Sequence, residues 1–146
     1  MHLVLDASIV VTVASGTTTE AAALRDWLTE KIGSDRAHII AGLTPLEVLS
    51  ALRRFEAREE IDPKWAAAVG RRIFGWPYVR EQLTQPHLER VWELRHNFTP
   101  YDAAYIAVTE ALQSNLKSRI ALVTADHKLL QAPENLHSCE VLAFPT

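Results

Sequence analysis

Four acidic side chains lie at separate points of this chain, each just after a strand-like run or at the start of a helix-like one. They are Asp6, Glu47, Asp102 and Asp126. If a parallel sheet brings the ends of those runs together, the four carboxylates meet at one edge of the sheet. Carboxylates that share a cleft repel each other, and only a bound divalent cation makes such an arrangement reasonable. The pattern therefore predicts a metal-dependent enzyme.

Each acid also has a structural explanation. Residues 44–47, Thr-Pro-Leu-Glu, have the form of a capping box, and residues 99–102, Thr-Pro-Tyr-Asp, repeat that form with Asp. A helix dipole favours an acid in the first turn by about 0.3–1 kcal/mol, and Asp6 and Asp126 could cap the helices that follow them. Capping alone, however, does not require all four acids to meet at one edge of a sheet, so their coincidence favours a site.

The elements that must position the acids follow from the periodicity of apolar residues. Strands are predicted from short apolar runs at 3–5, 38–41 and 120–123, with a last edge strand at 140–143. Helices are predicted at about 19–32, 44–58, 86–96 and 99–114, with others opening at 62–63 and at 126. Residues 74–82 are ambiguous, because Gly75 and Pro77 break helices while Tyr78-Val79 suits a short strand. The alternation predicts an α/β domain with a mainly parallel sheet, whose ligands bind beyond the carboxyl ends of the strands.

Composition indicates one globular domain over residues 1–146. The chain is 48% hydrophobic and 23% charged, and its net charge of -3 does not exclude a polyanionic substrate, because residues 51–96 carry nine Lys and Arg against seven Asp and Glu. Cys139 is the only cysteine, so no disulfide can form within the chain. The apolar N-terminus lacks a basic start and is interrupted by Asp6, which favours a strand and a helix over a signal peptide. No stretch approaches a membrane span, and we expect a cytoplasmic protein.

The motifs around the acids resemble those of PIN-domain ribonucleases, above all the VapC-type toxins of bacterial toxin–antitoxin pairs. The matching segments are L-V-L-D-A-S-I, L-T-P-L-E-V-L-S-A-L-R-R, Y-D-A-A-Y-I-A-V-T-E and L-V-T-A-D-H-K-L-L. They occur in the family's order, at about its spacing, and span nearly the whole chain. The resemblance implies a three-layer α/β/α fold and a Mg²⁺- or Mn²⁺-dependent endoribonuclease that acts as a toxin.

The resemblance also implies roles for single residues and for partners. The metal ligands and catalytic groups that it implies are Asp6, Glu47, Asp102 and Asp126. Ser8 and Thr124 match small hydroxyl positions beside the acids, where each is suited to orient a carboxylate or a metal-bound water, and Arg53 resembles an arginine common in the toxins. The implied partners are an RNA substrate, a small antitoxin whose tail blocks the metal site, and a second copy of the chain in a homodimer.

Other chemistry has weaker support in the sequence. The six histidines show no zinc-ligand spacing, and no glycine-rich nucleotide-binding motif occurs. The aromatic cluster Trp65, Phe74, Trp76 and Tyr78 is either core or a groove for an antitoxin segment. Two further interpretations stay open. A receiver-type phosphoryl-transfer domain gathers acids at a sheet edge but usually begins with paired acids, and a catalytically inactive PIN-fold scaffold typically loses acids that are all present here.

Overall fold

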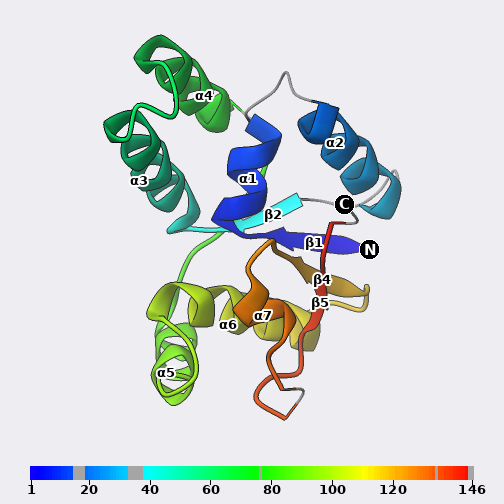
Figure 1. Ribbon diagram of the computed structural model, residues 1–146. Helices are drawn as coiled ribbons and strands as arrows, with labels where there is room; N and C mark the ends of the chain where they lie inside the picture. The colour runs from blue at the N-terminus through cyan, green and yellow to red at the C-terminus, as the bar shows by residue number, and fades with distance from the viewer. Residues whose placement is uncertain (15–18, 33–37, 76, 134, 145–146) are drawn as a thin grey trace.

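The computed structural model describes residues 1–14, 19–32, 38–75, 77–133 and 135–144, and its centre is a five-stranded sheet (Figure 1). The strands are β1 (His2–Leu5), β2 (His38–Ala41), β3 (Val79–Glu81), β4 (Ile120–Val123) and β5 (Glu140–Leu142). Their order in the sheet is β3-β2-β1-β4-β5, and every neighbouring pair is parallel. The predicted α/β class with a parallel sheet is confirmed.

Helices cover both faces of the sheet and complete the three layers (Figure 1). One face carries α1 (Ala7–Ala14), α2 (Thr19–Ile32), α3 (Thr44–Ala57) and α4 (Pro63–Gly75). The other carries α5 (Gln85–Glu93), α6 (Pro100–Asn115) and α7 (His127–Leu130). Because side chains alternate along a strand, Leu3 and Leu5 pack into the first layer while Val4 packs into the second. Each face of β1 is therefore buried, as expected for a central parallel strand.

The carboxyl ends of β1 and β4 lie side by side at the centre of the sheet. Leu5 pairs with Val123 at the last position of both strands, and both residues have no exposed surface. From β1 the chain first continues to β2 and β3 on one side, and later returns to β4 and β5 on the other. This reversal leaves a crevice beyond the carboxyl ends of β1 and β4, which is where ligands bind in open parallel sheets.

The start of α3 differs from its predicted form. Its N-cap is Leu43, whose side chain makes no capping hydrogen bond. The hydroxyl of Thr44 instead contacts the hydroxyl of Tyr105 at 3.0 Å, and that tyrosine hydroxyl also donates to Glu47. The predicted capping box at residues 44–47 is therefore wrong, because α6 supplies a tertiary partner to both side chains that the box would have used.

The segment that was ambiguous in sequence forms the end of a helix and an edge strand. α4 continues to Gly75, and β3 then pairs with β2. From the aromatic cluster, Trp65 and Tyr78 pack against the core beneath α1 to α4. Trp76 and the side chain of Phe74 lie outside the described residues. The two aromatic side chains that the structure describes therefore contribute to the core.

No single helix in the described ranges is long and apolar enough to cross a membrane. Among the described helices, α1 and α2 reach that length and composition when taken together, as a sharply bent pair.

Candidate active site

All four predicted acids line one pocket at the carboxyl edge of the sheet, about 420 Å³ in volume. Asp6 follows β1 directly, and Asp126 follows β4 after a short turn. Glu47 lies in the first turn of α3 and Asp102 in the first turn of α6, so these two carboxylates come from the opposite helical layers. The pocket is the crevice between β1 and β4 that the strand order creates.

Asp6 is the buried and firmly held member of the group, with 5% of its surface exposed. Its Oδ1 accepts hydrogen bonds from the Ser8 hydroxyl at 2.5 Å and from the Ile9 N–H at 3.1 Å. Its Oδ2 accepts one from the buried hydroxyl of Thr124, which also accepts from the Asp126 N–H at 2.9 Å. Burial raises the pKa of Asp6, repulsion from Asp126 adds to the rise, and the hydrogen bonds oppose it. The hydroxyls of Ser8 and Thr124 therefore both donate to the same carboxylate, that of Asp6.

Glu47 has a partner that sequence reasoning did not single out, Tyr105. The Tyr105 hydroxyl donates to Oε1 of Glu47 at 2.9 Å, and only 1% of the tyrosine surface is exposed. Burial raises the pKa of Tyr105, so this hydroxyl stays protonated and remains a donor. Burial also raises the pKa of Glu47, with repulsion from Asp6 and Asp102 in the same direction and the tyrosine hydrogen bond against it. The signal available in sequence was spacing, because Tyr105 lies one helical turn after Asp102.

Asp102 and Asp126 combine a place in the pocket with a place at a helix start. The Asp102 N–H donates to the Thr99 hydroxyl at 3.3 Å, so Thr99 caps α6 as predicted. Burial raises the pKa of the Asp102 carboxyl, and repulsion from Asp126 and Asp6 adds to it, while Lys128 lowers it. Oδ1 of Asp126 accepts from the Lys128 N–H at 2.7 Å and caps α7. Capping and site membership are therefore compatible at both positions.

Arg53 and Arg54 are both exposed, but of the two only Arg54 lines the pocket. Helical geometry explains the difference, because the i+7 position shares a face with the i position. Arg54 holds that position relative to Glu47 and lowers the pKa of its carboxyl. Spacing from Glu47 along α3 was the signal that could have selected Arg54 over Arg53.

The four carboxylates are the ligand type that a hard divalent cation prefers, but their oxygens do not converge on one coordination point. Burial and mutual repulsion raise the pKa of Asp6, Glu47 and Asp102, and a nearby cation would relieve that repulsion. Within the described ranges, no three His, Cys, Asp or Glu side chains stand arranged to hold an ion. Hydroxyl donors occupy Asp6 and Glu47. An ion would therefore be held partly through water, as Mg²⁺ commonly is, or after rotation of the less buried acids.

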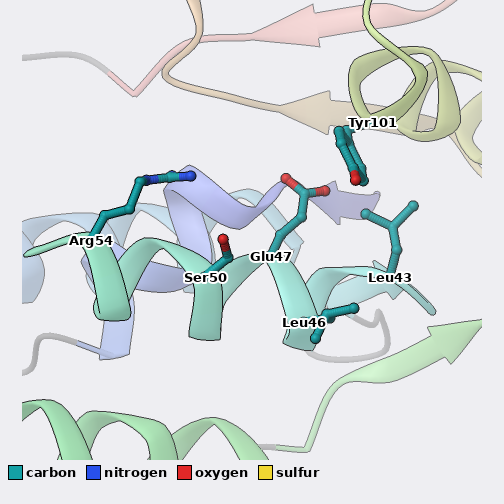
Figure 2. Close-up of a pocket in the computed structure, with 6 residues that line it drawn as sticks. All are labelled: Leu43, Leu46, Glu47, Ser50, Arg54 and Tyr101. Carbon is teal, nitrogen blue, oxygen red and sulfur yellow. The ribbon is translucent and has the colours of Figure 1, made fainter.

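A second hollow adjoins this pocket and shares part of its lining. Figure 2 shows Glu47, Ser50 and Arg54 projecting from α3 toward the same side, with Tyr101 entering from α6. Glu47 and Arg54 line both spaces. The carboxylate pocket is therefore continuous with a neighbouring surface that carries an aromatic ring.

Comparison with known proteins gives consistent results for sequence and fold. Residues 3–135 match the PIN domain. Ribonuclease VapC1 of Mycobacterium tuberculosis is 36% identical over 134 residues, which cover 89% of this chain and 90% of the relative. Ribonuclease VapC9 of the same species is 37% identical over 101 residues, or 67% of this chain and 71% of the relative. The crystal structure of VapBC2 from Rickettsia felis bound to a promoter DNA fragment matches 99% of this chain and 100% of its own, with a TM-score of 0.69 and 14% identity, which indicates a shared fold.

Proposed function

This chain belongs to the PIN-domain family, and from that membership we propose that it is a metal-dependent endoribonuclease, the toxin of a type II toxin–antitoxin pair. The observation that carries the proposal is the convergence of Asp6, Glu47, Asp102 and Asp126 on one pocket. The name of the relative that matches 89% of this chain, a ribonuclease, supports RNA as the substrate. The reaction is hydrolysis of an RNA phosphodiester bond.

Four carboxylates at one edge of the sheet suit Mg²⁺ or Mn²⁺, which prefer hard oxygen ligands. The residues that would hold the ion, directly or through water, are Asp6, Glu47, Asp102 and Asp126. When bound, the cation would polarise the scissile phosphate and activate a water for attack.

The protein's own groups divide the remaining work. The Asp6 carboxylate accepts three hydrogen bonds, which hold it in one orientation. Glu47 and Asp102 both line the pocket, and either carboxylate is placed to accept the proton of the attacking water as general base. Arg54 lies at the rim, where its guanidinium can hold a phosphate that flanks the cleaved bond.

We also propose a cytoplasmic toxin that forms a homodimer and binds a small antitoxin. The antitoxin is suggested by the structural neighbour from Rickettsia felis, which shares this fold and was solved as VapBC2. An arginine from an antitoxin tail would find a complementary partner in the carboxylate pocket, since bidentate pairing suits guanidinium and carboxylate. Light scattering at tens of micromolar should give twice the chain mass, and a strict monomer would contradict the dimer while leaving the nuclease proposal intact.

The decisive experiment compares the purified chain with Asp102→Asn. Wild type should cleave RNA in Mg²⁺ or Mn²⁺, stop in EDTA and resume when metal is restored. Asp102→Asn should keep the fold, because the cap of α6 comes from Thr99, and should lose cleavage, because one negative ligand is gone. Expression without antitoxin should slow growth for wild type alone. Equal cleavage by both proteins would mean either that Asp102 is not a ligand or that a contaminating nuclease cuts the RNA, and the second case fits the alternative, a catalytically inactive protein-binding scaffold.

A further inference from the structure

The hollow beside the carboxylate pocket combines apolar side chains, an aromatic ring and a cation. Its lining is Leu43, Leu46, Glu47, Ser50, Arg54 and Tyr101 (Figure 2). Its volume is about 440 Å³, within the usual range for ligand sites. Because Glu47 and Arg54 also line the carboxylate pocket, an extended substrate can occupy both spaces at once.

Two large apolar side chains of this hollow face solvent. Tyr101 is 59% exposed and Leu46 is 73% exposed. Neither is needed for the local fold, since Val48 and Leu52 pack α3 and Ala103 and Ile106 pack α6. Exposed apolar side chains that gather at a concave surface commonly mark a binding site. Tyr101 also directly precedes Asp102 in α6, so its ring lies beside the carboxylate pocket.

The combination of groups fits one nucleotide of RNA. A nucleobase presents flat apolar faces, which aromatic side chains recognise by stacking, and a phosphate presents the charge that arginine recognises. Tyr101 and Leu46 offer an apolar surface for the base, and Arg54 offers a positive charge for the phosphate. Bases within a duplex have both faces covered by their neighbours, so only an unpaired base can stack on a protein ring.

We propose that this hollow is the subsite for an unpaired nucleotide beside the scissile phosphate. The base stacks on the ring of Tyr101 and packs against Leu46, and Arg54 holds the adjoining phosphate. The inference rests on the proposed ribonuclease function and adds to it the residues that position the nucleotide beside the cut. Tyr101 is the positioning residue for the base, and Arg54 is the one for the phosphate.

Binding to RNA tests the subsite separately from cleavage. In an Asp102→Asn background, adding Tyr101→Ala should weaken binding of a fluorescein-labelled, unstructured RNA decamer by about ten- to a hundredfold, the usual effect of losing one stacking platform. Tyr101→Phe should retain the affinity, because stacking requires the ring and not the hydroxyl. Affinity for a blunt RNA duplex should not change with any substitution at Tyr101.

Trp92→Ala is the matched control. Trp92 is an exposed aromatic residue of α5, 67% exposed, and lies outside both lined spaces. Its loss should leave decamer affinity and cleavage unchanged. Should Tyr101→Ala bind the decamer as tightly as its parent while the mass from light scattering falls, the hollow is a protein interface and the RNA subsite is overturned.

The outcomes separate this inference from the proposed function. If wild type cleaves RNA in a metal-dependent way and decamer affinity is indifferent to Tyr101, the subsite is wrong and the nuclease stands. If wild type cleaves no RNA while affinity depends on the Tyr101 ring, the subsite stands as an RNA-binding surface and the enzyme proposal fails. If neither effect appears, both are overturned.

Discussion

The hydroxyl of Tyr105 donates a hydrogen bond of 2.9 Å to Oε1 of Glu47, and this bond joins α6 to α3 across the candidate site. The two residues belong to helical layers on opposite faces of the sheet. The same hydroxyl lies 3.0 Å from the Thr44 hydroxyl, so it links the start of α3 to the interior of α6. The position of the Glu47 carboxylate therefore depends on a residue far away in sequence.

Removing this bond with Tyr105→Phe should affect both stability and pH dependence. The free energy of unfolding should fall by roughly 1–3 kcal/mol, because a carboxylate loses a buried donor. The tyrosine bond lowers the pKa of Glu47, so its loss raises that pKa and should move the acidic limb of the pH–rate profile to higher pH. Urea unfolding and kcat/KM against pH measure the two effects. Tyr101→Phe, which removes an exposed hydroxyl, is the control, and an acidic limb that stays in place would argue against this role.

The acids should make the metal-free protein less stable as pH rises. Folding raises the pKa of Asp6, Glu47 and Asp102 above their ordinary values of 3.8 for Asp and 4.5 for Glu. These groups therefore favour the folded state fully below those values, and that contribution is lost as pH rises through the raised values. In EDTA, the contribution of these acids to the melting temperature should therefore decrease as pH rises from 4 toward neutrality. Mn²⁺ or Mg²⁺ should restore it at neutral pH by binding the folded state.

Asp6→Asn tests whether this effect belongs to the site. The substitution removes one negative charge and keeps an oxygen that can accept from the Ser8 hydroxyl. In EDTA at neutral pH its melting temperature should equal or exceed that of wild type, and the shift induced by Mn²⁺ should be much smaller. Equal metal-induced shifts in the two proteins would place the bound ion elsewhere.

Arg54→Ala and Arg53→Ala form a matched pair on α3. Only Arg54 lines the carboxylate pocket, so only its loss should raise KM for RNA, by about five- to tenfold if one phosphate contact disappears. The slope of log affinity against log salt for single-stranded RNA should also become less steep by about 0.7. Titrations at several salt concentrations measure this slope. The reverse order of effects would assign the phosphate contact to Arg53.

Thr124 and Ser8 both donate to Asp6, but their loss should differ in cost. Thr124 is fully buried, and Thr124→Val removes the donor to Asp6 together with the acceptor of the Asp126 N–H. We expect a loss of roughly 1–3 kcal/mol in urea unfolding, since buried polar groups are left without partners. Ser8→Ala should cost less, because Ser8 is exposed and Asp6 keeps two donors. Thr124→Ser should restore most of the loss, and equal costs for Ser8→Ala and Thr124→Val would contradict the arrangement.

The sequence by itself determined the elements and the edge of the sheet at which the acids lie. Apolar runs predicted all four of the strands at 3–5, 38–41, 120–123 and 140–143. The first three are predominantly apolar because they are buried on both faces, whereas β5 is a half-buried edge strand. Acids directly after a strand, such as Asp6, or in the first turn of a helix that follows a strand, such as Glu47, then lie at the carboxyl edge of the sheet. Asp102 opens α6, which follows another helix, so its place at that edge was decided by the tertiary structure. One helix boundary was less well predicted, since α5 ends at Glu93 rather than near residue 96, where buried Leu94 turns the chain toward α6.

Only the tertiary structure decided which partners each acid has. Local periodicity carries no information on strand order, yet that order brings the Thr124 hydroxyl to Asp6. Local periodicity also carries no information on how α3 and α6 face each other. Their packing gave Glu47 a tyrosine donor in place of the predicted capping box. Hydrogen bonds form within about 3 Å, so partners are chosen by packing between segments far apart in the chain, and packing is a property of the whole fold.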